Sequence, residues 1–497
     1  MQLLVALCIA AVGFVIHRDV LRAEILGYDS YALIVSSRIE SLGDFLGTFS
    51  ETMMDGRLDA GDFYRPVANL GLAFDYSVWG LDPFGYQLTN LLVFCAGVVA
   101  LHALARRVLG RGAWLGPGVG ALFYALHPAA LSALPYPARR PETLWLLFAA
   151  CALAVLPDAP SRGAWRRQLL AGTIAALALG SKESGVIVLG LIGVHQLLFS
   201  PGGAAARFQS ALRATAIAAG PVAVVLLARI AVIGGLGGYA MSIEESYGER
   251  FLAWAPNYVT AALMSQPSGS LALDRWLPLS AGVGLVLLSL VFGASRLGRV
   301  DERSRRASAL FTVAGAWLVA QLFLVANSVH FTYRYAPAIV FPIALLVAAL
   351  VEASWLCAGR RDRTSRIWAG VACLTLLLVI PPALSGSALL RTYPGMDRAS
   401  RAQRQTLVAL ELAIPVAREG ELLRVDLRRS IPVESRIVDS FWLMAHWGLQ
   451  GWLDMNFPDR RYEVRVQQRP GVPHDSFAAT TLYPYALPSR GGVDGER

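Results

Sequence analysis

A single lysine, Lys182, stands in the middle of apolar sequence, in the segment GSKESGV at residues 180–186. It is the only lysine among the 44 Lys and Arg residues of the 497-residue chain, and Glu183 follows it directly. An ammonium group on a flexible stem is a point charge that suits a phosphate oxygen. The residue types therefore predict an anion-binding role for Lys182. The alternative is that Lys182 and Glu183 cap a short helical hairpin or pair with each other.

Other charged residues stand at the edges of apolar runs. Arg139, Arg140 and Glu142 lie in PYPARRPETL, and Arg334 lies between two tyrosines in FTYRYAP. Arginine forms forked hydrogen bonds to phosphate oxygens, and charges at membrane depth usually face a bundle interior or a wet cavity. Together with the lone lysine, Arg140 and Arg334 predict a site for an anionic substrate whose tail stays in the bilayer. For Arg334, cation–π packing on a neighbouring tyrosine without a ligand is the alternative.

Two further residue types could take part in chemistry. Asp29, in GYDSY, lies about a dozen residues after the first apolar run, where a carboxylate can act as general base on an acceptor hydroxyl. His127 precedes a proline in LHPAAL and is typical of a helix end, because the proline ends regular hydrogen bonding. The chain contains no G-x-S-x-G, Walker or H-E-x-x-H motif, so the corresponding hydrolase and NTPase interpretations have no support.

The composition is that of an integral membrane protein. Hydrophobic residues make up 55% of the chain and charged residues only 16%, whereas soluble domains are about 25% charged. The net charge of +9 arises from arginines clustered between apolar runs, which is a topology signal and argues against nucleic acid as a partner. Five cysteines without C-x-x-C spacing and seven scattered histidines predict neither a metal site nor another cofactor.

Eleven apolar runs are candidate membrane spans, since about 17–25 residues are needed to cross the hydrocarbon core. They are 1–17, 86–106, 113–134, 142–157, 168–181, 184–199, 214–233, 277–295, 309–327, 337–357 and 367–386. The first run could instead be a signal peptide, but it lacks a basic n-region, so a first span is the better interpretation.

The loops between these runs differ in charge, and the side that carries the arginines is expected to be cytoplasmic. These arginines are Arg106, Arg107, Arg111, Arg162, Arg166, Arg167, Arg207, Arg213, Arg296, Arg299, Arg303, Arg305, Arg306, Arg360, Arg361, Arg363 and Arg366. The N-terminus is then inside, and the loops 18–85 and 234–276 are outside together with the segment after residue 386. Within the first loop, YRPVANLGLAFDYSVW has the spacing of a helix that lies in the membrane interface.

The two parts of the chain therefore differ in expected fold class. Residues 1–386 are expected to form an all-α polytopic membrane domain with about eleven spans, N-terminus in and C-terminus out. Residues 387–497 contain the period-2 runs LLRVDL and RYEVRVQ, which predict a small extracytoplasmic α+β region.

The order of several segments resembles that of one family of enzymes. The segments are YDSYAL, FYRPVANLGLAFDYSVWGLDPFGYQLTNLL, ALFYALHPAALSALPYPARRPETL, LALGSKESGVIVL and YRYAPAIVFPIALL. In this order they resemble the GT-C glycosyltransferases, most closely the transmembrane O-mannosyltransferases that carry tetratricopeptide repeats, and their bacterial relatives. The resemblance covers roughly residues 28–200 and 330–345.

The resemblance implies that Asp29 is the catalytic carboxylate and that later segments line an external cavity. The implied cavity residues are Arg65, Arg140, Glu142, Lys182, Glu183 and Arg334, with Tyr335 and His127 also at the substrate. It further implies an inverting enzyme of the bacterial inner membrane, which moves a sugar from a polyprenyl-phosphate-linked donor to an extracytoplasmic acceptor. Such a displacement needs a base on the acceptor and cations on the leaving phosphate.

The sequence departs from the family pattern in three places. The paired acid is here Asp29-Ser30, the second histidine after His-Pro is absent, and no tetratricopeptide repeats follow. The acceptor is therefore left open between a protein, a glycan and a lipid, including an amino-sugar transfer to lipid A. A transporter or flippase of a lipid-linked saccharide is the alternative from another class, although we find no inverted repeats. A non-catalytic assembly subunit is a further alternative.

Overall fold

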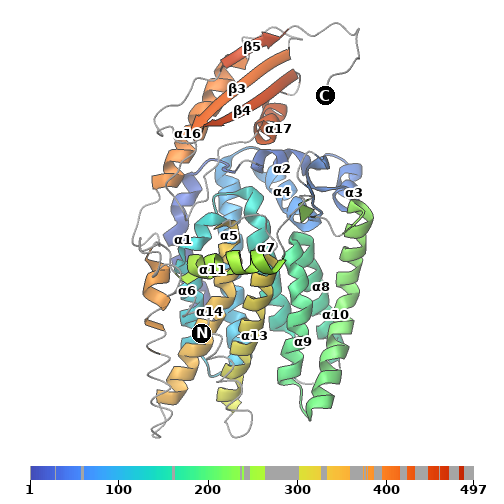
Figure 1. Ribbon diagram of the computed structural model, residues 1–497, viewed down its shortest axis with the longest axis vertical. Helices are drawn as coiled ribbons and strands as arrows, with labels where there is room; N and C mark the ends of the chain where they lie inside the picture. Colours follow the sequence, from blue (N-terminus) through green and yellow to red (C-terminus); the bar gives the residue numbers. More distant parts are fainter. Residues whose placement is uncertain are drawn as a thin grey trace.

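The computed structural model describes most of the chain. The described residues are 2–27, 29–56, 61–158, 163–235, 238–239, 247–263, 302–325, 333–358, 373, 376–377, 379–385, 394–414, 422–430, 446–457, 459, 461–469 and 481–485. They form a bundle of long helices, with short helices over its upper end and a small sheet beyond them (Figure 1).

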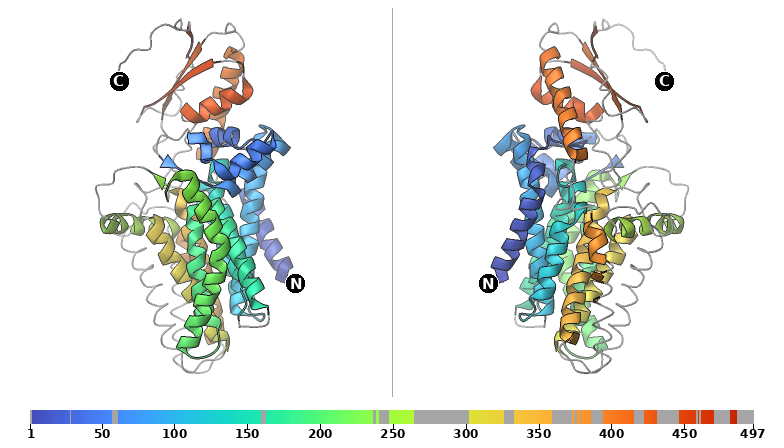
Figure 2. Two further views of the ribbon diagram at one scale, coloured as in Figure 1. Left: turned by 90° about the vertical axis from the view of Figure 1, so that its right-hand side faces the viewer. Right: turned by 90° about the vertical axis from the view of Figure 1, so that its left-hand side faces the viewer.

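The helices of the bundle, long and short, run roughly side by side (Figures 1 and 2). They are α1 (Gln2–His17), α5 (Pro83–Leu109), α6 (Leu115–Leu126), α7 (Arg140–Val155), α8 (Ala164–Ser181), α9 (Ile187–Phe199), α10 (Ala204–Ile233), α13 (Glu302–Val325) and α14 (Ala336–Ala358). Helix α11 (Tyr247–Leu263) instead crosses the bundle (Figure 1).

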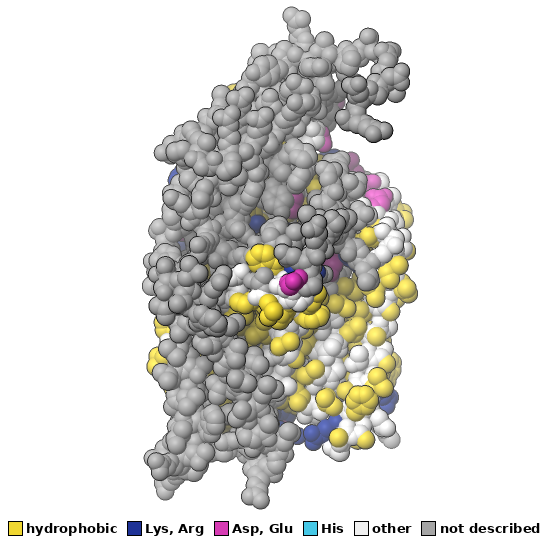
Figure 3. Space-filling model, in the orientation of Figure 1, with side chains coloured by type: hydrophobic (Ala, Val, Ile, Leu, Met, Phe, Trp, Pro, Cys, Tyr) yellow, Lys and Arg dark blue, Asp and Glu magenta, His cyan; other side chains and the backbone are white. Residues whose placement is uncertain are grey.

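The described helices are those of a multi-pass membrane protein. Five are long and apolar enough to cross a bilayer, judged by length and composition: Gln2–Arg22, Pro83–Leu109, Ala204–Ile233, Glu302–Val325 and Ala336–Leu356. Hydrophobic side chains cover much of the visible flank of the described bundle, and basic side chains gather at its lower end (Figure 3). The count of eleven spans stays a prediction, because 277–295 and half of 367–386 lie outside the described residues.

One predicted span is divided. The run 113–134 forms α6 only as far as Leu126, and a 3-10 helix, η3 (Pro128–Ser132), follows. His127 between them is extended, with ψ of 130°, because a residue before proline is disfavoured in the helical region. The interpretation of His127 as a helix-end residue is thus confirmed.

Small residues let α6 lie close to α14. A Cβ atom added to Gly120 would stand 2.6 Å from the carbonyl oxygen of Ala344, and one added to Gly116 would meet the carbonyl of Ala348. Such glycines spaced four apart are typical of closely packed helices in membranes. The contact holds the end of α6, and with it the segment that leads to Arg139, against the late helix α14.

Short elements occupy the predicted first loop. They are the 3-10 helices η1 (Arg18–Arg22) and η2 (Met53–Gly56), the helices α2 (Ser30–Ser36), α3 (Leu42–Ser50) and α4 (Pro66–Trp79), and strand β1 (Gly61–Asp62), which pairs antiparallel with β2 (Gly238–Tyr239). Helix α4 covers the run that predicts an interfacial helix. Three further 3-10 helices, η4 (Pro137–Arg139), η5 (Glu183–Val186) and η6 (Tyr333–Tyr335), stand at the starts of α7, α9 and α14.

The C-terminal segment packs on the first loop. It contains α16 (Pro394–Ala413), α17 (His446–Asn456) and a sheet of order β4-β3-β5. Strands β3 (Leu422–Ser430) and β4 (Arg461–Arg469) are parallel, and β5 (Thr481–Tyr485) is antiparallel to β3.

Helices of this segment share an apolar core with α2, to which Leu410, Trp452 and Leu453 contribute. Gln403 of α16 also donates to the carbonyl of Ile25 at 2.6 Å. The C-terminal helices thus brace the residues on both sides of Asp29.

Candidate active site

Asp29 occupies the N-cap position of α2, but it does not cap the helix. Its carboxylate makes no capping hydrogen bond, although aspartate is among the preferred N-cap residues. The turn is held instead by Ser30, whose hydroxyl donates to Leu26 O at 2.6 Å and accepts from Ala138 N at 3.4 Å. The carboxylate of Asp29 is therefore left available for other interactions.

Three arginines from distant segments act on Asp29. Burial of this side chain raises its pKa above the usual value, and the positive charges of Arg139, Arg334 and Arg65 act against that rise. Arg139 ends η4, Arg334 lies in η6, and Arg65 directly precedes α4. A carboxyl group with a raised pKa among cations has the electrostatic character of a general base or acid at a functional site.

Lys182 is buried at the C-terminal end of α8 and pairs with a different acid from the one expected. Its ammonium donates to the Oε1 atom of Glu142 and lies 4.4 Å from the ring centre of Tyr335. The other carboxylate oxygen of Glu142 is buried and has no hydrogen-bond partner among the described residues. The interpretation in which Lys182 pairs with Glu183 is thus wrong, because the hairpin turn directs the two side chains to different partners.

Glu183 is held by two arginines. Arg65 donates to it from Nε at 3.1 Å and from Nη2 at 2.9 Å, and Arg229 donates from Nη1 at 3.1 Å. Arg229 also donates to the carbonyl of Tyr64 at 3.2 Å. These bonds tie the segment before α4 to η5 and α10.

Sequence reasoning missed Arg229. The sequence does contain an indication that Arg229 has a partner, since it is the only charged residue in the apolar run GPVAVVLLARIAVI. A lone charge at membrane depth is expected to face the bundle interior and to have a partner. In the structure it is 4% exposed and bonded to Glu183.

These groups form one polar centre, because Arg65 and Arg334 interact electrostatically with both Asp29 and Lys182. The polar centre comprises Asp29, Arg65, Arg139, Glu142, Lys182, Glu183, Arg229 and Arg334. With every side chain ionised, its five bases and three acids leave two positive charges. Arg334 also donates to the hydroxyl of Tyr335 at 2.6 Å and lies 4.7 Å from its ring centre, so the cation–π packing expected from the sequence is present. An anion is the ligand that such a surplus favours.

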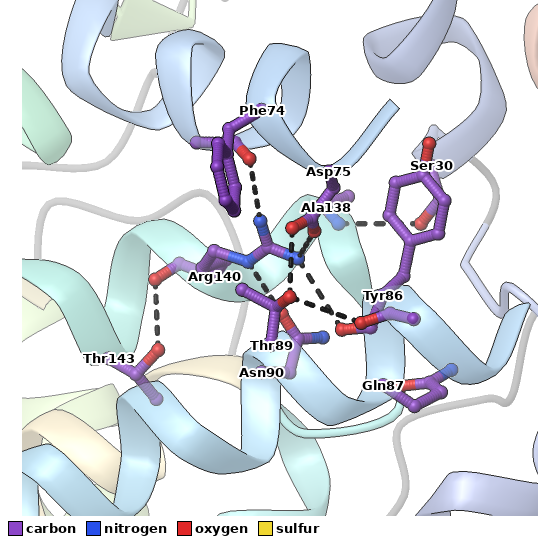
Figure 4. A network of polar contacts seen from close by, with 12 residues as sticks. Ser30, Phe74, Asp75, Tyr86, Gln87, Thr89, Asn90, Ala138, Arg140 and Thr143 are labelled. Atoms are coloured by element: carbon purple, nitrogen blue, oxygen red, sulfur yellow. Dashed lines mark hydrogen bonds and ion pairs between the residues drawn. The ribbon is translucent and has the colours of Figure 1, made fainter. Parts of the chain in front are cut away.

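Arg140 does not belong to this centre. It is 2% exposed, donates to Asn90 Oδ1 at 2.7 Å and to the carbonyl of Gly71 at 3.1 Å, and forms an ion pair with Asp75 (Figure 4). Thr89 donates to the second oxygen of Asp75 at 2.8 Å. These contacts favour a structural role that joins α4, α5 and α7, in place of the predicted contact with a donor phosphate.

His127 is likewise bonded within the protein. Its Nδ1 atom accepts from the backbone N–H of Ala129 at 3.1 Å, so the ring proton lies on Nε2, which donates to the carbonyl of Ala262 at 2.9 Å. Both ring nitrogens are thus used, and the contacts favour a structural role over substrate binding. Within the described part of the chain, no group of three or more His, Cys, Asp or Glu residues could hold a metal ion.

Comparison with known proteins gives partial matches. Protein O-mannosyl-transferase tmtc2 of Xenopus laevis is 30% identical over 139 residues, which are 27% of this chain and 16% of that protein. Protein O-mannosyl-transferase Tmtc1 of Drosophila melanogaster is 26% identical over 205 residues, which are 38% of this chain and 22% of that protein. No protein-family model matches the chain.

Part of this chain is a distant homologue of the transmembrane O-mannosyltransferases. The resemblance expected from the ordered segments is thereby confirmed. The chain spans only about a fifth of the length of these O-mannosyltransferases, so their activity does not transfer to it directly.

Two solved structures are similar over most of the chain. ArnT from Cupriavidus metallidurans matches with a TM-score of 0.47 and 16% identity, over 92% of this chain and 88% of that one. The oligosaccharyltransferase AglB from Archaeoglobus fulgidus matches with a TM-score of 0.44 and 12% identity, over 93% of this chain and 63% of that one. Likenesses of this degree carry no argument about catalysis.

Proposed function

We propose that this protein is an inverting glycosyltransferase that moves a sugar from a polyprenyl-phosphate-linked donor to an extracytoplasmic acceptor. The observation that carries the proposal is the carboxylate of Asp29. It makes no helix-capping hydrogen bond and interacts electrostatically with three arginines. The partial homology to the O-mannosyltransferases supports the same chemistry. The acceptor is a hydroxyl-bearing protein, glycan or lipid.

In the proposed reaction, Asp29 takes the proton of the acceptor hydroxyl as its oxygen attacks the anomeric carbon of the sugar. The bond between that carbon and the donor phosphate oxygen breaks, and the phosphate leaves with the electron pair. Arg139, Arg334 and Lys182 stabilise the negative charge that develops on the phosphate. Arg65 and Glu183 bind each other and hold the loop in place. Attack from the side opposite the phosphate inverts the anomeric configuration.

The proposed arrangement in the membrane follows from the charges. The arginine-rich end of the bundle is placed in the cytoplasm of a bacterial inner membrane, which gives about eleven spans with the N-terminus inside. The polar centre then lies at the external surface, where an acceptor can approach. The C-terminal α+β region is proposed to lie outside the membrane, where α16 and α17 support the loop that carries Asp29.

Replacement of Asp29 by Asn tests the proposal. The amide keeps the shape of the side chain and removes the base, so we expect transfer from a polyprenyl-phosphate-linked sugar to fall by about 10²- to 10⁴-fold. The matched control is Asp19→Asn, which changes an exposed aspartate of the same loop and should leave transfer unchanged. Full transfer by Asp29→Asn would refute the base role. Transport of the lipid-linked saccharide by both variants, with no transfer by the native protein, would favour a flippase.

A further inference from the structure

A polar cavity lies at the other end of the bundle, away from the polar centre. It has a volume of about 850 Å³ and opens between the start of α1, the end of α5, the first turn of α13 and the end of α14. Six arginines line it: Arg106, Arg107, Arg111, Arg167, Arg303 and Arg306. A cavity of this size is within the usual range for small-molecule sites. We call it the arginine pocket.

The acidic side chains of the arginine pocket already have partners within the protein. Asp158 pairs with Arg107 at 3.0 Å and with Arg306 at 3.3 Å. Glu302 pairs with Arg306 at 2.8 Å, and Glu352 accepts from a backbone N–H at 3.1 Å. Three acids face six arginines, so the ionised pocket carries three surplus positive charges.

Three side chains of the arginine pocket carry buried polar atoms that have no hydrogen-bond partner among the described residues, and Gln2 contributes an acceptor, its Oε1 atom. The Nε2 atom of His102 and the Nε atom of Arg106 are buried and have no hydrogen-bond partner among the residues that the structure describes. His102 is 2% exposed, and both residues line the cavity. They stand four residues apart on α5 and therefore share one face of that helix. Buried polar atoms without partners are costly. A ligand oxygen in the cavity would accept from Arg106, and from His102 when its ring proton lies on Nε2.

We propose that the arginine pocket binds the phosphate group of an anionic ligand, which a membrane lipid headgroup or a free phosphate compound could supply. Arginine side chains form forked hydrogen bonds to phosphate oxygens. Arg106 and Arg111 supply donors that the acids of the pocket leave unused, and His102 supplies another when its ring proton lies on Nε2. The site is separate from the polar centre and does not depend on the proposed transfer reaction.

The wall formed by α1 favours a lipid as the source. Leu3 lines the pocket and is 65% exposed, and Leu4 and Leu7 on the same helix are 64% and 50% exposed. An acyl chain can lie along this apolar surface while its phosphate enters among the arginines. Basic pockets between helices at the cytoplasmic side are a known form of lipid recognition.

Binding by the purified full-length protein in neutral detergent tests the proposal. Native mass spectrometry and thermal shift would measure short-chain phosphatidic acid, short-chain phosphatidylcholine and inorganic phosphate in parallel. We expect phosphatidic acid to bind, and Arg106→Gln and Arg111→Gln each to weaken binding by about 10- to 100-fold, the effect of one lost charge-assisted hydrogen bond. The matched control is Arg166→Gln, an exposed arginine near the pocket that does not line it. Asp29→Asn should bind as the native protein does.

The three ligands separate the outcomes. Tighter binding of phosphatidic acid than of inorganic phosphate assigns the site to a lipid, whereas equal binding with the same dependence on Arg106 and Arg111 assigns it to a free phosphate compound. Phosphatidylcholine that binds as tightly as phosphatidic acid would overturn the proposal. So would an equal loss of binding in the Arg166→Gln control.

Discussion

The ion pair between Lys182 and Glu142 allows stability and function to be measured separately. Both side chains are buried, at 8% and 6% exposure. Lys182→Met would leave the carboxylate of Glu142 without its cation, and removal of one partner of a buried pair costs about 3–5 kcal/mol. With an unfolding entropy of about 2.1 cal/mol/K per residue, the 497-residue chain has about 1 kcal/mol/K in total. The expected fall in Tm is therefore about 3–5 °C.

The double variant Lys182→Met, Glu142→Leu completes the experiment. Replacement of a buried pair by apolar residues of similar volume is often neutral or stabilising, so its Tm should return to within about 1 °C of the native value. Transfer should stay low in the single and the double variant, because both lack the ammonium that stabilises the leaving phosphate.

Scanning calorimetry in detergent and a transfer assay on the same preparations would measure both properties. The exposed pair of Arg305 with Glu302, at 2.5 Å, provides the control, and Arg305→Gln should change stability by less than about 1 kcal/mol. A double variant as unstable as the single one would refute the account of stability. A double variant that transfers sugar at the native rate would refute the phosphate contact.

Three further predictions concern the loop and its supports. Since burial raises the pKa of Asp29 above its usual value and the base must be ionised, transfer should fall as the pH drops through that raised pKa. For the same reason Asp29→Asn should raise Tm at neutral pH, and an acidic limb unchanged in an Asp29→Glu variant would contradict the assignment. Arg229→Met removes one of two cations from Glu183 and should lower Tm by about 1–4 °C, while Arg229→Lys should recover part of that loss in the same melting experiment. A Cβ atom at Gly451 would stand 2.9 Å from backbone atoms of Ala32, so Gly451→Leu should separate α17 from α2 and speed hydrogen exchange in both helices; unchanged exchange would refute the packing.

Much of the bundle could be predicted from the sequence, because apolar runs of membrane length leave few alternatives to helices. The strand-like runs at LLRVDL and RYEVRVQ coincide with β3 and β4. The positions at which helices end were harder to predict from the sequence. The run 113–134 looks continuous in hydropathy, and only the constraint of Pro128 on the backbone of His127 divides it.

The sequence by itself determined which groups could do chemistry: a carboxylate after the first run, a lone lysine, and arginines at the edges of apolar segments. It could not decide partners, since consecutive residues at a helix start point about 100° apart. The tertiary structure therefore places Arg139 in the field of Asp29 and directs Arg140 to Asp75. The partners of Lys182 and Glu183 were decided in the same way, because an ion pair forms only where the rotation and depth of separate helices bring opposite charges together. The buried polar atoms of the arginine pocket that lack a partner among the described residues likewise became visible only when α1, α5, α13 and α14 were assembled.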